Sequence, residues 1–166
     1  MRRGVAFAVL VILVAGCGYS VRGHLPSHIK TVAVPIFVNR TAEPAVEGLL
    51  TRAIVEAFST NGKLTVVRPE EADAILEGEV VGYTVDSIAF DPRANVRQYR
   101  LTVTLNLRFK DTKKNELLFE QRNFQERADF QVVSAVADTI SREENALRLA
   151  AVDIARSVVN LAVERF

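Results

Sequence analysis

The clearest pattern of apolar and polar positions lies between residues 99 and 110. Two sets of side chains alternate there: Tyr99, Leu101, Val103, Leu105, Leu107 and Phe109 against Arg100, Thr102, Thr104, Asn106, Arg108 and Lys110. Strict alternation predicts a β-strand with one face covered by the protein and the other open to water or to a partner. Residues 74–90 and 116–126 flank this strand across two turns, and we expect both to be strands of the same sheet.

Two further segments carry apolar residues at helical spacing. Between Glu43 and Thr60 such residues recur every three or four positions, and Asn61-Gly62 supplies a left-handed stop. A second stripe begins behind Ser141-Arg142-Glu143-Glu144, which has the Ser-x-x-Glu form of a capping box, and runs to the end of the chain. Each helix is apolar on one face only, so each needs a second layer to cover that face.

One more strand completes the expected domain. Residues 31–38 are rich in β-branched side chains, and Pro35 indicates an edge position or an early exit from the strand. Residues 64–67 add at most a short extension. The prediction is therefore one α/β (α+β) domain over residues 31–166. We expect a two-layer sandwich whose four-stranded mixed sheet, of order β-α-β-β-β-α, carries two helices on one face.

The chain starts with an apolar run between Arg3 and the sequence Val14-Ala15-Gly16-Cys17. As a helix, residues 4–16 would span roughly 20 Å, which is shorter than the ~30 Å core of a bilayer. A basic start, a short apolar stretch and small residues before the only cysteine are typical of a bacterial lipoprotein signal peptide, here residues 1–16. Cys17 would then carry acyl chains such as palmitate, whereas ordinary secretory cleavage would leave it free.

The residues after the cysteine predict a tether and a location. Residues 17–30 mix Gly, Pro, Ser and His without any period, so we interpret them as an acylated N-terminus that leads into the fold. Gly18 follows the cysteine, whereas an Asp at that position typically retains a lipoprotein in the inner membrane. We therefore expect a lipid-anchored protein on the periplasmic side of the outer membrane.

Composition argues against several classes of function. Once Arg2 and Arg3 are removed with the signal, the 20 acidic residues outnumber the basic ones by one, which disfavours a nucleic-acid binder. The sequence has no Gly-rich phosphate loop, zinc-ligand spacing or Gly-x-Ser-x-Gly elbow. The two histidines, His24 and His28, both fall in the expected tether, and carboxylate pairs such as Glu143-Glu144 are expected to be solvated surface. We therefore expect no enzyme, no metal and no cofactor.

The order of these features is similar to that of one family. The resemblance of this chain to that family rests on Cys17-Gly18-Tyr19, Gly23, Leu25-Pro26, Ile29-Lys30-Thr31-Val32, Gln98 to Val103, and the start of the last helix over residues 141–155. Together they resemble the LptE family of lipopolysaccharide-assembly lipoproteins of Gram-negative bacteria. The resemblance implies a protein that plugs the outer-membrane barrel LptD, helps it to assemble, and binds lipopolysaccharide during its delivery to the cell surface.

Two sets of residues are candidates for these contacts. The open sheet face would suit the polar interior of a large barrel, and it comprises Arg100, Thr102, Thr104, Asn106 and Arg108. In an up-down-up meander, the turn at 91–97, the exit after Phe130 and the start of the second helix share one end. This predicts a phosphate-binding set for lipopolysaccharide made of Arg93, Arg97, Arg127 and Arg142. The alternative is that these four are unrelated surface arginines. The first strand is expected at the end of the sheet opposite to them.

A second function stays open at this point. A lipoprotein that activates a periplasmic cell-wall synthase would also be a small α/β domain on a tether. Such a partner lies across the cell-wall layer, so it requires many disordered residues after the cysteine. The short tether expected here favours a partner in the same membrane.

Overall fold

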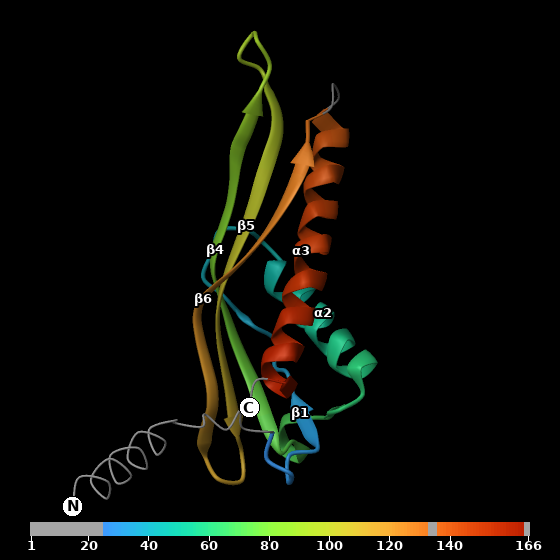
Figure 1. Cartoon of the computed structure of the whole chain (residues 1–166), viewed down its shortest axis with the longest axis vertical. Coiled ribbons are helices and arrows are strands. Elements are labelled where there is room, and N and C mark those ends of the chain that lie inside the picture. The colour runs from blue at the N-terminus through green and yellow to red at the C-terminus, as the bar shows by residue number, and fades with distance from the viewer. Residues whose placement is uncertain (1–24, 133–135, 165–166) are drawn as a thin grey trace, which may run out of the picture.

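Three long antiparallel strands dominate the structure, a computed structural model that describes residues 25–132 and 136–164. They are β4 (Ala74–Phe90), β5 (Val96–Asp111) and β6 (Glu116–Gln131), and they form the expected meander (Figure 1). The alternating stretch lies within β5, the central strand of the three. Cys17 and the expected signal segment lie outside the described residues, so lipidation stays a prediction.

The other side of β4 carries short parallel strands. They are β1 (Thr31–Ala33), β2 (Val38–Asn39) and β3 (Thr65–Val66). The sheet order is β3-β1-β4-β5-β6, with β2 also paired to β4. The expectation of a mixed sheet is confirmed, but the sheet has six strands rather than four. Pro35 accounts for one difference, because it has no N–H and lies where residues 31–38 divide into two strands. The two residues of β3 are too few to show alternation in the sequence.

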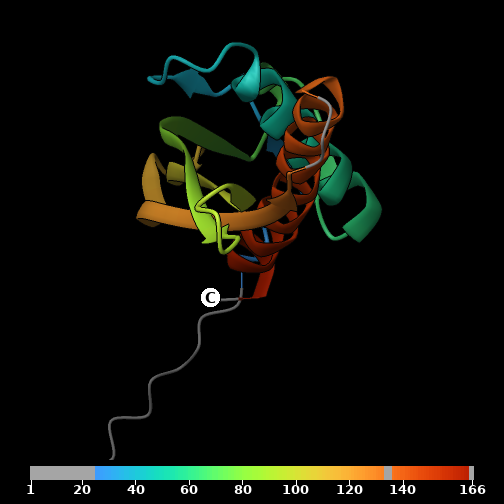
Figure 2. The same cartoon turned by 90° about the horizontal axis from the view of Figure 1, so that it is seen from above.

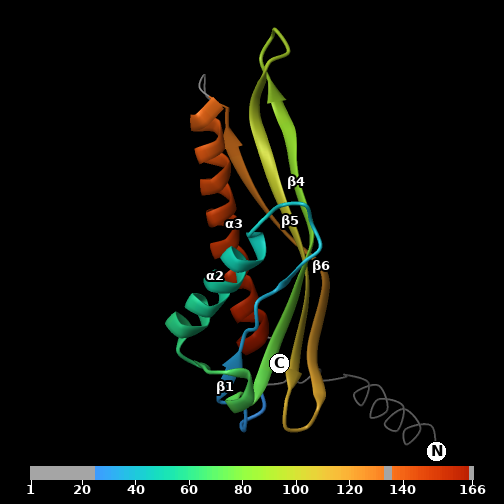
Figure 3. The same ribbon diagram turned by 180° about the vertical axis from the view of Figure 1, so that it is seen from behind.

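Both helices lie on the same face of the sheet, as predicted. They are α2 (Val46–Asn61) and α3 (Val136–Glu164), and they pack against each other as well as against the strands (Figures 1 and 3). A short 3₁₀ helix, η1 (Pro69–Glu71), precedes β4. Viewed from above, the strands curve around α3 (Figure 2). The structure is thus a two-layer α+β sandwich.

The predicted end of α2 is confirmed, whereas the predicted start of α3 is wrong. Gly62 adopts a left-handed conformation with φ 72° and donates its N–H to the Phe58 carbonyl at 3.1 Å. In contrast, α3 begins at Val136, so Ser141 lies inside the helix and cannot be its cap. No glycine or proline between these two residues stops the helix from extending upstream.

The hydrophobic core lies between the sheet and the helices. The inward side chains of β5 are fully buried, namely Leu101, Val103, Leu105, Leu107 and Phe109. Leu50, Ile54 and Phe58 of α2 and Ile154 and Val158 of α3 close the same core from the other layer. Burial of one such side chain contributes about 1.5–3 kcal/mol. The core therefore uses one face of the sheet and leaves the other face free.

The segment between β1 and β2 is held in place by an aromatic ring. Phe37 is 2% exposed and lies so close to Gly78 that a Cβ on this glycine would be 2.3 Å from the ring. The Phe37 N–H donates to Thr51 Oγ1 of α2 at 3.1 Å. This contact links the segment to both β4 and α2, while the neighbouring Ile36 is 75% exposed.

A buried carboxylate helps to fix the end of the sheet where β1 lies. Asp111 is 1% exposed and contacts His28 Nε2 at 2.6 Å. Ile29 is 3% exposed and belongs to the core. The folded part thus includes residues that the sequence pattern assigned to the tether. Figure 1 shows β1 at the end opposite the β4–β5 turn, as expected.

Candidate functional site

The face of the β4–β5–β6 sheet that points away from the helices is mostly polar. Of the predicted set, Arg100, Thr102, Thr104 and Asn106 are half-exposed and Arg108 is exposed. In an antiparallel sheet, directly paired residues share a face, so β4 and β6 contribute their partners. Thr84 and Arg127 flank Thr102, and Gly82 and Gln125 flank Thr104. The alternation in the sequence therefore predicted this surface, which we call the polar face.

Ion pairs occupy the two ends of the polar face. At one end Arg100 donates two hydrogen bonds to Asp129, at 2.7 and 2.8 Å. This pairing lowers the pKa of the Asp129 carboxyl and raises that of the guanidinium. At the other end Arg108 lies 3.2 Å from Glu120, and Lys110 lies 2.8 Å from Glu77. The charged groups of these pairs are matched within the sheet, and the hydroxyl-rich middle lies between them.

Asn106 has a structural role in addition to its place on this face. Its Oδ1 accepts the N–H of Asn123 at 3.0 Å. Asn123 has a left-handed φ of 52°, at the register shift where β6 bulges opposite β5. The side chain thus supports the bulge, and substitution of Asn106 would disturb the strand as well as any contact.

Two adjoining hollows mark the half of the polar face nearer to β1. One has a volume of about 370 Å³ and lies beside the exposed apolar residues Ile36 and Val38. The other, of about 240 Å³, extends toward Glu120 and Arg122. Both are lined by Glu79, Asn106 and Arg108. This part of the face is therefore concave, with an apolar rim and a charged floor.

The elements that carry the predicted arginine set, namely the β4–β5 turn, the end of β6 and the start of α3, lie toward the same end of the molecule (Figure 1). Asp91 organises the turn by accepting the N–H groups of Arg93 and Asn95, each at 2.9 Å. The Asn95 amide, with these backbone bonds and the nearby Arg97, holds the pKa of Asp91 below its ordinary value. The Arg97 guanidinium also donates to Asp91, at 3.1 Å.

The two remaining arginines occupy separate surfaces. Arg127 is on the polar face and donates to Gln125 Oε1 at 3.3 Å. Arg142 is exposed, but it lies in the second turn of α3 rather than at its amide-rich start, because the helix begins at Val136. The structure thus gives Arg97 and Arg127 partners within the chain and leaves the joint role of the four arginines as a prediction.

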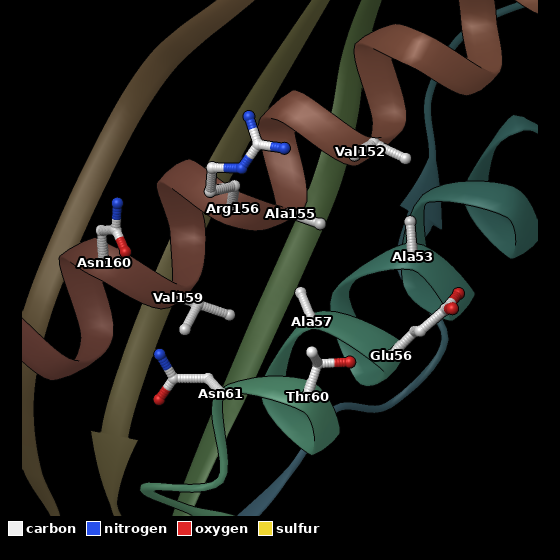
Figure 4. Close-up of a pocket in the computed structure, with 10 residues that line it drawn as sticks. All are labelled: Ala53, Glu56, Ala57, Thr60, Asn61, Val152, Ala155, Arg156, Val159 and Asn160. Carbon is white, nitrogen blue, oxygen red and sulfur yellow. The ribbon is translucent and has the colours of Figure 1, made fainter.

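A further groove separates the two helices on their outer side (Figure 4). It has a volume of about 380 Å³, and small side chains such as Ala53 and Ala57 of α2 face Ala155 of α3 across it. Glu56 and Arg156 lie at its border. The helical periodicity predicted both stripes but not this groove, because the groove depends on how closely the helices approach.

A polar contact between the two layers had no signal in the sequence. Tyr83 of β4 donates its hydroxyl to Glu143 of α3 at 3.0 Å. Burial and this carboxylate raise the pKa of Tyr83. Glu143 was expected to be solvated, but it is half-buried because it points toward β4.

Neither helix among residues 25–132 and 136–164 is both long and apolar enough to cross a membrane. The same residues contain no group of three or more His, Cys, Asp or Glu side chains that could hold a metal ion.

Solved structures show that the fold occurs in other bacterial proteins. A protein from Xanthomonas campestris matches with a TM-score of 0.56 at 15% identity, over 80% of this chain and 82% of that one. Lipoprotein B from Nitrosomonas europaea matches with a TM-score of 0.53 at 17% identity, over 87% and 92%. PelC from Paraburkholderia phytofirmans, a dodecamer, matches at 0.51 and 14%, over 80% and 87%. At these identities the likeness concerns the fold alone.

Sequence comparison identifies the family. Curated protein sequences give no significant match. The sequence model of the LptE family, described as lipopolysaccharide-assembly, matches residues 29–161. This range includes every strand and nearly all of both helices. The chain therefore belongs to the LptE family of lipopolysaccharide-assembly lipoproteins.

Proposed function

We propose that this protein is an outer-membrane lipoprotein that plugs the LptD barrel, helps it to assemble and binds lipopolysaccharide on its way to the cell surface. The signal segment 1–16 would be removed, acyl chains on Cys17 would anchor the protein, and the residues between Cys17 and His28 would lead to the domain on the periplasmic side. The role is non-enzymatic. The family match over residues 29–161 is the observation that carries the proposal.

The polar face supports a barrel partner. The interior of a large outer-membrane barrel is polar, and the face offers matched ion pairs at its ends with hydroxyl groups between them. Affinity purification from outer membranes, with mass spectrometry of the bound proteins, tests the proposal directly. Recovery of LptD supports it, whereas recovery of a cell-wall synthase in its place would favour the alternative function.

We expect the double variant Thr102→Glu with Thr104→Glu to reduce recovery of LptD about tenfold or more, because two new carboxylates would add negative charge to the surface proposed to face the barrel. Both positions are half-exposed, so the fold should tolerate the change. The measurement is the amount of LptD purified with each variant. Asn145→Glu with Leu149→Glu adds the same charge on an exposed side of α3 and serves as control. An equal loss in the control, or none in the test variant, would point to another surface.

We expect Arg93→Asp with Arg142→Asp to weaken lipopolysaccharide binding about tenfold, because the guanidinium groups suit phosphate oxygens and aspartates repel them. Both side chains are exposed, so thermal unfolding should change little. The measurement is retention of purified lipopolysaccharide by the protein. Arg52→Asp with Arg148→Asp makes the same change in net charge on α2 and α3. If both double variants bind equally, the arginine set has no specific role.

A further inference from the structure

One edge of β4 is paired with other strands only in the first half of the strand. In that half β1 pairs with Ala74 and Ile75, and β2 pairs with Glu79 and Val80. The last backbone contact on this side runs from the Arg40 N–H to the Val80 carbonyl at 2.9 Å. Beyond Val80, no strand within residues 25–132 or 136–164 pairs with this side of β4. Figures 1 and 3 show the upper part of β4 as an outer strand of the sheet.

The open stretch is a regular strand. Register shifts occur between Val80 and Gly82 and between Ser87 and Ala89. From Gly82 to Ser87, by contrast, every residue is paired in sequence with one of β5. Six residues at about 3.3 Å each give roughly 20 Å, the length of an ordinary strand. Half of the N–H and C=O groups of an edge strand point away from the sheet, so this stretch is a template for one more strand.

The opposite edge of the sheet differs in its side chains. The regular stretch of β6, Phe124–Gln131, contains Glu126, Arg127 and Asp129, and α3 packs against this strand. Closely spaced charges and a covering helix are the usual protection of an edge against added strands.

The open stretch of β4 lacks such closely spaced charges, although Tyr83 within it donates a hydrogen bond to Glu143 of α3. Asp86 is its only charged residue, and the same edge continues to Ile88 and Phe90, which are 38% and 59% exposed. The two edges of the sheet thus differ. The β6 edge carries charges and a packed helix, whereas the β4 edge is open and is followed by exposed apolar side chains.

We propose that Gly82–Ser87 accepts an extended strand from a partner polypeptide, which becomes an additional strand of the sheet. On the helix side the added strand would carry apolar residues beside Tyr83 and Val85, which are half-buried. On the polar side it would carry a lysine or arginine beside Asp86. This interaction goes beyond the proposed function, because it uses the backbone edge of the sheet and not its polar face.

Asp86 distinguishes a foreign strand from a second copy of this chain. Its paired residue in β5 is Arg100, but that guanidinium already makes two hydrogen bonds to Asp129. The nearest partner of Asp86 is the Thr84 hydroxyl at 3.3 Å. Residues 81–90 contain no lysine or arginine, so two copies joined at this edge could not neutralise their aspartates. A basic strand from another polypeptide can.

The test is amide hydrogen exchange on the full chain in detergent with a defined probe. The probe is the capped peptide Thr-Val-Arg-Val-Thr-Val-Thr-Ser, in which polar and apolar residues alternate up to the final serine and which carries one arginine. We expect the peptide to slow exchange within Gly82–Ser87 and to leave Phe124–Gln131 unchanged. The same peptide with alternate backbone nitrogens methylated has the same side chains but lacks donors, and it should have no effect.

A charge exchange tests the pairing with Asp86. Asp86→Lys should weaken binding of the arginine peptide about fivefold and should strengthen binding of a peptide with glutamate in place of arginine. Asp86 is exposed, so this variant should fold. Any of three results would overturn the proposal: unchanged exchange over Gly82–Ser87, equal protection by the methylated peptide, or no reversal of preference in Asp86→Lys. Protection that appears with rising protein concentration alone would show that a second copy occupies the edge.

Discussion

Gly78→Ala is expected to destabilise the protein by about 3 kcal/mol, because the new methyl group has no space beside a rigid ring. A Cβ at this position would lie 2.3 to 2.5 Å from three ring carbons of Phe37. The ring cannot move aside easily, because Phe37 is 2% exposed and its N–H donates a hydrogen bond to Thr51 Oγ1. Either the segment between β1 and β2 or the β4 backbone must shift. Urea unfolding followed by circular dichroism measures the loss.

Two other glycines provide matched controls for this variant. A Cβ on Gly82 would lie 3.1 Å from Thr104 on the polar face, so Gly82→Ala should cost less than about 1 kcal/mol. Gly48 lies within α2, where the nearest atom is 4.0 Å away, so Gly48→Ala should stabilise the protein by about 0.5–1 kcal/mol. Phe37→Leu should recover part of the loss when combined with Gly78→Ala. Equal stability of Gly78→Ala and the wild type would contradict the close packing of Phe37 against Gly78.

The sequence predicted those parts of the fold whose signal is long and local. The alternation of β5 repeats over many positions, so the fully buried side chains from Leu101 to Phe109 and the polar face opposite them could both be predicted. The left-handed stop at Gly62 could also be predicted, since glycine adopts that conformation more readily than any other residue.

Short elements and helix starts had no such signal. A strand of two residues, such as β2 or β3, cannot show a period of two, so the sheet was predicted with too few strands. The capping box at Ser141 has the correct residue types, but a helix begins where its backbone first becomes helical, here at Val136. Residue pattern alone does not exclude extra turns upstream.

The polar contacts that hold distant segments together could not be predicted from the sequence. His28 and Asp111 are 83 positions apart, and Tyr83 and Glu143 are 60 apart. Nothing in the neighbourhood of either residue identifies the other. For the candidate site, the sequence predicted which residues share a face, but it did not predict the pairing of Arg97 with Asp91.

The carboxylate of Asp73 links three segments that are distant in the sequence, at the end of the sheet that contains β1. Its Oδ2 accepts the N–H groups of Lys30 and Thr31 at 2.9 and 3.1 Å, and its Oδ1 lies 2.6 Å from the Lys113 ammonium. The backbone carbonyl of Asp73 accepts the Thr112 N–H at 2.9 Å. The residue is 8% exposed. One side chain thus fastens the start of β1 and the β5–β6 turn to the start of β4.

Asp73→Asn is therefore expected to lower the free energy of unfolding at pH 7 by about 2–3 kcal/mol, because hydrogen bonds to a charged group are replaced by bonds to a neutral one. Lys113→Met removes the cation and should cost less, since the backbone donors remain. Asp153→Asn, on the exposed side of α3, should change stability by less than about 0.5 kcal/mol.

The pH dependence gives a second measurement on the same residue. The Lys113 ammonium, with the Lys30 and Thr31 amide groups, holds the pKa of Asp73 far below its ordinary value of 3.8. A carboxyl with a lowered pKa in the folded state stabilises the fold fully above its ordinary pKa, and this stabilisation is lost as the pH falls below it. The difference in unfolding free energy between wild type and Asp73→Asn should thus be constant from pH 7 to about pH 5. It should shrink steadily below about pH 4. A difference that stays constant down to about pH 2 would mean that the charge of Asp73 contributes nothing, and that the cost of the variant comes from altered geometry alone.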